Sequence, residues 1–257
     1  MIKNIIVFVL LVLLFASGCT SRKDIVYLYN RPDGYAPIEY QKKAVENRLK
    51  PGDVIYVRIL SLNKEITDLF NLDNAGNRTN ITSETSINLQ GFSINPGGYI
   101  RLPIIDSIKV EGLTVFEAES EIQKKVNEYF LNATVIVKLL NAKISVLGEV
   151  NRPGNFFVYR NQLSVFEALA MAGDVNQFAD KKRILVIRTA GEKNKTYRID
   201  LTDENIMNSE AFYLLPDDIV IVEPLRLKAF RLNNPTISLA FSAVSTLILT
   251  LTYINNR

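Results

Sequence analysis

The hexapeptide LTVFEA at residues 113–118 recurs fifty residues later as LSVFEA at residues 163–168. Each copy has Thr or Ser followed three residues later by Glu, with apolar residues around both. This pattern is typical of a capping box, in which a hydroxyl and a carboxylate satisfy backbone N–H groups at the start of a helix. We therefore expect two amphipathic helices, which continue over residues 118–130 and 168–172.

A second repeat predicts how strands enter the fold. The stretch LKPGDVIYV at residues 49–57 recurs as LLPDDIVIV at residues 214–222. In both copies a Pro-led turn leads into a β-branched run, which is typical of a turn that feeds a buried strand. Two successive strand–helix–strand units predict an α+β fold with two small domains. The strands expected around the two helices are 98–103, 133–139, 148–159 and 184–188.

The composition excludes several kinds of chemistry. The 257 residues include no His, no Trp and a single Cys. Histidine-dependent catalytic triads, His/Cys zinc sites and intrachain disulfides are therefore excluded. A net charge of +3 gives no reason to expect a nucleic-acid partner. We expect no catalytic residue, no cofactor and no metal, and the chain is not predicted to be an enzyme.

The acidic residues fit this interpretation. Glu117, Glu119 and Glu121 are expected on a solvated helix face, and Asp217 and Asp218 in a turn. Glycoside hydrolysis needs two carboxylates that converge on a sugar cleft, and no spacing in the chain indicates such a pair.

Two other stretches allow simple interpretations. Phe156, Phe157 and Tyr159 have the side chains to stack on sugars, although an alternating strand more commonly places such residues in a core. Half of residues 71–90 are Asn, Ser or Thr, which predicts an exposed loop.

The first residues read as a bacterial export signal. Lys3 precedes an apolar run over residues 5–15, which is too short to span a bilayer, and small residues follow at 16–18. The only cysteine, Cys19, comes directly after them, where lipoprotein precursors carry the residue that receives acyl chains. We therefore predict a signal peptide over 1–18 and lipid attachment at Cys19, and Thr20 at the next position favours the outer membrane.

The other end carries a second apolar run, over residues 235–254, which contains no charge and is long enough to span a membrane as a helix. Hydroxyl residues fall on one side of it at helical spacing, and lipid cannot satisfy them. We expect several copies to form a ring in which these residues line a wet pore. A lone anchor whose hydroxyls bond back to their own carbonyls, or a core helix of the last domain, are the alternatives. The predicted pore-lining residues are Ser238, Ser242, Ser245, Thr246 and Thr252.

Three basic residues precede this run. Arg226, Lys228 and Arg231 are expected to meet lipid headgroups or lipid A phosphates, and binding of an acidic polymer is the alternative.

Taken in this order, the motifs resemble the polysaccharide export family of outer-membrane lipoproteins. Residues 49–57 and 98–114 are similar to its export domain. Residues 148–150, 153–154, 163–173 and 215–222 are similar to its soluble-ligand-binding β-grasp (SLBB) domain. The chain differs at Asp106 and Asp174, where the family generally has Gly, which bears on local turn geometry. Only one β-grasp unit is present, whereas larger relatives have two.

The resemblance implies a ring-shaped homo-oligomer, octameric in the best-known relative, through which a capsular polysaccharide or exopolysaccharide leaves the periplasm. Its implied partners are the exported polysaccharide, outer-membrane lipid and an inner-membrane co-polymerase of the tyrosine-kinase type. We expect a signal peptide (1–18), a lipid-anchored segment (19–46), an export domain (47–142), an SLBB domain (143–224), and a linker with a transmembrane helix (225–257).

Three functions compete at this point. The chain is expected to be a subunit of a polysaccharide conduit, because a protein tethered by acyl chains alone has no use for a second membrane-directed end. The alternatives are a monomeric lipoprotein that binds glycan without forming a pore, and a periplasmic carbohydrate-active enzyme.

Overall fold

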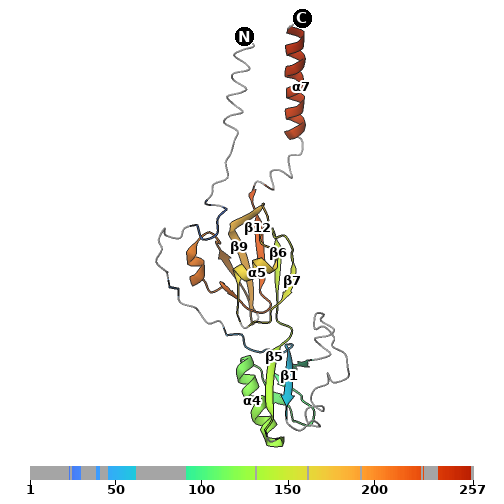
Figure 1. Ribbon diagram of the computed structural model, residues 1–257, viewed down its shortest axis with the longest axis vertical. Helices are drawn as coiled ribbons and strands as arrows, with labels where there is room; N and C mark the ends of the chain where they lie inside the picture. The colour runs from blue at the N-terminus through green and yellow to red at the C-terminus, as the bar shows by residue number, and fades with distance from the viewer. Residues whose placement is uncertain are drawn as a thin grey trace.

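A computed structural model shows two units arranged along the long axis of the molecule (Figure 1). It describes residues 23, 25–29, 39–40, 46–61, 91–130, 132–160, 162–191, 193–226, 228 and 237–255. Cys19, Arg231 and the predicted loop 71–90 lie outside the described residues.

The first unit is a three-stranded antiparallel sheet covered on one face by a helix. Its central strand β1 (Val54–Leu60) lies between β2 (Phe92–Ser93) and β5 (Thr134–Leu139). A short ribbon of β3 (Tyr99–Ile100) and β4 (Ile108–Lys109) accompanies it. Helix α4 (Val115–Tyr129) buries its apolar stripe against alternate residues of β1 and β5. The stripe consists of Ala118, Ile122 and Val126.

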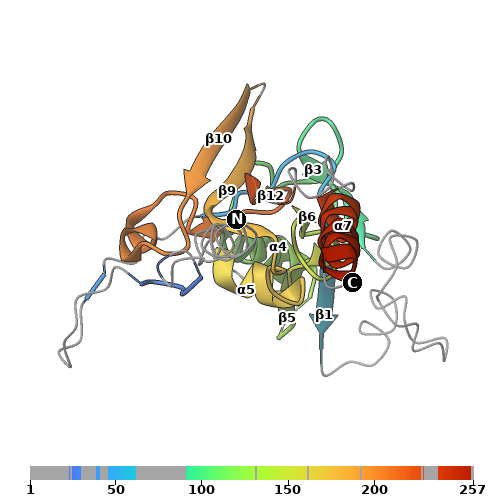
Figure 2. The ribbon, with the colours of Figure 1, turned by 90° about the horizontal axis from the view of Figure 1, so that it is seen from above.

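The second unit is a five-stranded mixed sheet with the order β10-β9-β12-β6-β7. Strands β6 and β12 are parallel, and the other neighbours are antiparallel. Helix α5 (Val165–Met171) covers one face, and the β9–β10 hairpin extends away from it in the view from above (Figure 2). The strands are β6 (Lys143–Gly148), β7 (Gly154–Phe157), β9 (Ala179–Ala190), β10 (Lys193–Ile199) and β12 (Ile219–Pro224).

Smaller elements complete the second unit. Strand β8 (Leu163–Ser164) pairs with β11 (Tyr213–Leu214), and a short 3-10 helix, η3 (Glu204–Asn208), follows β10. Together with α5 they close the buried side of the sheet, whose core contains Ile144, Val186 and Val220.

Both predicted capping boxes are present. The hydroxyl of Thr114 accepts a hydrogen bond from the N–H of Glu117, and the Glu117 carboxylate accepts one from the N–H of Thr114 at 2.7 Å. Ser164 and Glu167 make the same reciprocal pair. The helices therefore begin at the residue after each hydroxyl, as the repeat predicted.

The strand predicted over 148–159 is wrong in its first half. Gly148 ends β6 instead of starting a strand, because its φ of +88° turns the chain. A Cβ at this position would lie 2.1 Å from the carbonyl oxygen of Val222, so only glycine fits. The strand predicted over 98–103 is likewise shorter, since only Tyr99 and Ile100 pair.

The prediction of a C-terminal transmembrane helix is also wrong. In the described part of the chain, no helix is long and apolar enough to cross a membrane. The apolar run was counted from residue 235, whereas helix α7 spans Ile237–Asn255, and hydroxyl residues recur along it. Counting uncharged residues therefore overstated its match to a hydrocarbon layer.

Candidate functional site

The hydroxyl residues of α7 bind their own helix. Ser245 Oγ donates to the carbonyl of Phe241 and Thr246 Oγ1 to the carbonyl of Ser242, both at 2.8 Å. Thr252 makes the same bond to the carbonyl of Ile248. This is the back-bonding that the lone-anchor alternative required. The side chain of Ser238 is not among those described, and the pore-lining role of these residues stays a prediction.

The segment Ile25–Tyr29 docks on the second unit, although the first unit follows it in sequence. The Tyr27 hydroxyl donates to Asp174 Oδ1, and its ring meets Phe166 edge-on with centroids 5.8 Å apart. The Leu28 N–H donates to the carbonyl of Leu201 at 3.0 Å. Burial, with the bond to Asp174, raises the pKa of Tyr27. The N-terminal segment is thus fixed to the second unit.

Asp174 explains one departure from the family pattern. Its φ is +70°, which is the conformation that a glycine would adopt there. Asp tolerates the left-handed region better than most residues, and its carboxylate receives the Tyr27 hydroxyl. The substitution therefore keeps the turn and adds a docking contact.

The chain leaves the second unit beside this docked segment. The N–H of Leu225 donates to the carbonyl of Phe178, and the Lys228 ammonium lies 2.6 Å from Glu149 Oε1. Asn176 Nδ2 donates to the other Glu149 oxygen at 3.0 Å. The Lys228 bond is the largest cause of a lowered pKa at Glu149. Lys228, predicted to meet headgroups, is therefore already engaged within the fold, whereas Arg226 is exposed.

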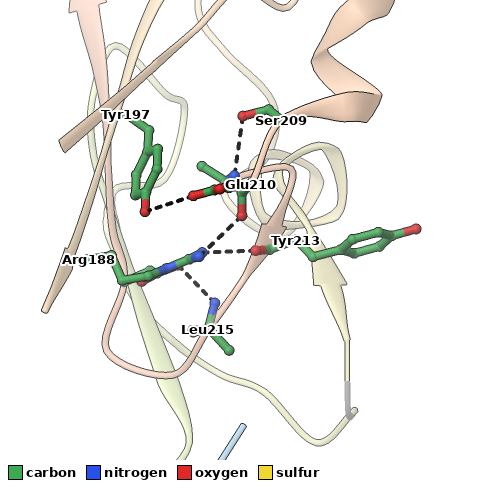
Figure 3. Close-up of polar contacts among 8 residues, drawn as sticks. Arg188, Tyr197, Ser209, Glu210, Tyr213 and Leu215 are labelled. Atoms are coloured by element: carbon green, nitrogen blue, oxygen red, sulfur yellow. Dashed lines mark hydrogen bonds and ion pairs between the residues drawn. The ribbon is translucent and has the colours of Figure 1, made fainter. Parts of the chain in front are cut away.

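A buried arginine joins the sheet of the second unit to β11, and Figure 3 shows its contacts with Glu210 and Tyr213. Arg188 Nη2 lies 2.7 Å from Asp218 Oδ2, and Arg188 also donates to the carbonyls of Glu210 and Tyr213. The N–H of Leu215 donates to Asp218 at 2.8 Å. With its donors and acceptors satisfied, the pair is structural, which agrees with the expectation that Asp218 is a turn residue.

The two units meet at their repeated turns. The Lys50 ammonium, at the start of the first turn, lies 2.6 Å from Asp217 Oδ2 in the second. Val54, Tyr56, Leu140 and Phe157 pack as a small cluster beside this pair. Among the described residues, an exposed ion pair and an apolar cluster thus join the two units.

The aromatic residues of the second unit divide between core and surface. Phe156 packs on the core, and Phe157 belongs to the junction. The ring of Tyr159 stacks on Phe157 with centroids 6.5 Å apart and is 67% exposed.

The sheet face opposite α5 has an aliphatic centre, with Ser145, Thr196 and Arg198 beside it, and is covered by no helix in the described part of the chain. Alternation along the strands places its residues opposite the core, and the strand register brings them side by side. They are half-buried, apart from one exposed leucine. We call them the open face: Leu147, Leu185, Ile187, Ile219 and Ile221. Uncovered apolar faces of this kind are commonly sites of association.

Among the described residues, no cluster of three or more His, Cys, Asp or Glu side chains forms a cation site. Glu119, one of the three helix glutamates, instead accepts a hydrogen bond from the N–H of Val137 at 2.9 Å.

Comparison with known proteins explains the two units. The model of the polysaccharide biosynthesis/export protein family matches residues 41–140, and the SLBB domain model matches residues 142–222. The chain belongs to this polysaccharide export family. The first unit is accordingly its export unit and the second its SLBB unit, and the family is one of transport proteins.

Two curated relatives are similar to most of this chain. The chain is 28% identical over 188 residues to the EPS I polysaccharide export outer membrane protein EpsA of Ralstonia solanacearum, which covers 71% of this chain and 49% of the relative. It is 26% identical over 187 residues to the protein of the same name from Ralstonia nicotianae, with coverages of 70% and 48%. The export-family chain thus spans about half the length of the curated relatives it matches.

Sequence reasoning missed the docking of the N-terminal segment. Tyr27 and Asp174 are 147 positions apart, and no local pattern joins them. It also missed the role of Glu149, which belongs to the Gly-Glu-Val motif at 148–150. The sequence signal for this role was the position of a charged residue directly after the glycine of that motif.

Proposed function

We propose that this chain is a lipid-anchored subunit of a homo-oligomeric conduit that carries polysaccharide out of the periplasm at the outer membrane. The observation that carries the proposal is the pair of export and SLBB units in this chain, together with its similarity to relatives named as polysaccharide export outer membrane proteins. A capsular polysaccharide or exopolysaccharide is the cargo, and an inner-membrane co-polymerase is the partner that drives it.

The docked N-terminal segment supports an orientation in which the SLBB unit lies at the membrane. Cys19 is six residues from Ile25, so acyl chains on Cys19 would hold the SLBB unit within about 20 Å of the lipid surface. The export unit then extends into the periplasm, toward the inner-membrane partner.

The open face supports assembly from several copies. Its five aliphatic side chains would gain stability by burial against a neighbour, and lateral contacts between identical subunits close rings when the contact is heterologous. The enzyme alternative has no comparable support from the geometry of the carboxylates.

A deletion strain tests the cargo. Cells that lack the chain should lose surface polysaccharide and accumulate it in the periplasm, and the wild-type chain should restore export. A Cys19→Ser variant should fail to restore it and should not incorporate palmitate. Unchanged surface polysaccharide in the deletion strain would refute the proposal.

Native mass of the detergent-extracted protein tests the assembly. The wild type should be a defined oligomer, and Ile221→Arg on the open face should shift it to monomer. Phe116→Arg is the matched control, because Phe116 is 76% exposed on the export unit and should leave the oligomer intact. A monomeric wild type would favour the simple glycan-binding lipoprotein.

A further inference from the structure

One end of the SLBB unit combines exposed apolar and basic side chains. Ile25 and Val26 are 53% and 36% exposed, although the next two residues, Tyr27 and Leu28, pack on the core. Apolar side chains beside basic ones are the combination found where proteins lie on a lipid interface.

A bulge at the start of β9 supplies the basic side chains. In the pairing of β9 with β12, Val222 lies opposite Ile184 and Pro224 opposite Ala179. Residues 180–183, with the sequence DKKR, therefore lie opposite the single residue Glu223. Bulges of this kind re-aim side chains at functional edges of sheets.

The bulge holds the N-terminal segment directly. Lys181 Nζ donates to the carbonyl of Ile25 at 2.6 Å and lies 3.9 Å from the centre of the Tyr27 ring. The carbonyl of Lys181 accepts from the N–H of Leu201. The backbone of Ile25 is thus held beside the bulge, and Val26 follows it directly.

Two more cations lie at the same end. Lys182 follows Lys181 and is exposed, and Arg226 is exposed two residues beyond Pro224, the partner of Ala179. Two carboxylates lie among these cations. Glu223 is shared by Arg183 at 3.0 Å and Arg198 at 3.9 Å, and Asp180 Oδ1 accepts a hydrogen bond from the N–H of Lys182 at 3.1 Å.

We propose that Ile25, Val26, Lys182 and Arg226 form a membrane-contact surface that binds an anionic lipid surface. The inference rests on the proposed lipid anchor, which would place this end against the membrane. The apolar pair enters the headgroup region while the two cations meet lipid phosphates. Through this surface the SLBB unit contacts the membrane directly, in addition to being tethered to it by the acyl chains.

The other end of the same hairpin provides a matched control. Lys193 and Lys195 are exposed on β10, and Lys193 pairs with Ala190 at the far end of β9. They carry the same charge as Lys182 and Arg226 but lie far along β9 from the docked segment.

Vesicle co-sedimentation tests the charges. The full chain carrying Cys19→Ser, which cannot be acylated, should bind phosphatidylglycerol vesicles and should not bind phosphatidylcholine vesicles. Each basic residue near an anionic surface contributes roughly fivefold to binding, so Lys182→Gln with Arg226→Gln should weaken binding at least about tenfold. Lys193→Gln with Lys195→Gln should leave it unchanged. Equal losses in both double variants, or no binding by the parent, would overturn the proposal.

Substitution of an apolar side chain tests the apolar part of the membrane-contact surface. Ile25→Asn should weaken vesicle binding several-fold, whereas Ile104→Asn should not, although Ile104 is 59% exposed on the export unit. Equal binding by both variants would overturn the apolar contact. Because these assays use no polysaccharide and no acyl chain, their failure would leave the export proposal standing.

Discussion

The two copies of the Pro-led turn share their backbone but differ in what the final aspartate binds. Gly52 and Asp217 occupy the same turn position with φ of +89° and +68°. Asp53 and Asp218 each accept a hydrogen bond from the N–H three residues earlier, at 3.0 and 2.8 Å. Only Asp218 also binds a buried arginine. A repeated motif thus specifies a turn, while tertiary contacts decide how much stability depends on it.

The largest expected difference lies between these two aspartates. Asp218→Ala leaves Arg188 buried without its anion and should lower the free energy of unfolding by about 3–5 kcal/mol. Asp53→Ala removes a turn contact and should cost about 1 kcal/mol. Burial raises the pKa of Asp53, which further limits what its charge contributes. Urea denaturation of both variants measures the gap, and equal losses would contradict the comparison.

The helix repeats should differ next. Phe166 packs against Tyr27 and Phe212, whereas its counterpart Phe116 is 76% exposed. Phe166→Ala should cost about 2 kcal/mol, because it opens a cavity under the docked segment. Phe116→Ala should change stability by less than about 0.5 kcal/mol. Thermal unfolding distinguishes them, and a large loss at Phe116 would show that its ring has a partner in solution.

The capping boxes should behave alike and so mark where the repeats are equivalent. Thr114→Ala and Ser164→Ala should each cost about 1 kcal/mol, since each removes one acceptor from a helix N-terminus. Thr114→Ser and Ser164→Thr are the controls and should retain most of the stability. A difference of more than about 1 kcal/mol between the two alanine variants would break the equivalence.

The smallest effect concerns pH. Bonds to the backbone and hydroxyl of Ser164 lower the pKa of Glu167 below its ordinary value of 4.5. The folded state then holds this proton less tightly than the unfolded state, so the contribution is complete above pH 4.5 and is lost as pH falls through the lower folded pKa. Glu167→Gln should flatten the loss of stability on acidification below pH 4.5. If the wild type and Glu167→Gln lost the same free energy of unfolding between pH 4.5 and lower pH, the contribution of the Glu167 carboxylate would be contradicted.

The parts predicted from sequence were those with local causes. The capping boxes located the starts of α4 and α5 because a hydroxyl and a carboxylate three residues apart act within one helical turn. The repeated turns predicted β1 and β12 for the same reason. Gly148 was misread because its requirement for glycine comes from Val222, which is distant in sequence.

The candidate site was predicted less well. Uncharged length suggested a membrane helix at the C-terminus, but length alone does not measure apolarity, and the described part of α7 does not meet that requirement. Lys228 was expected at headgroups on charge alone, whereas Glu149 binds it. The bulge at residues 180–183 depends on strand register, which no single stretch of sequence encodes.

The docking of Ile25–Tyr29 on the SLBB unit also constrains the order in which the protein folds. Its contact surface includes Phe166, Asp174 and Leu201, so this surface is complete only after most of the polypeptide has been synthesised. Closing such a long loop carries an entropic cost that only the finished SLBB unit can offset, so docking is a late step. The first residues to leave the ribosome are therefore among the last to reach their native place.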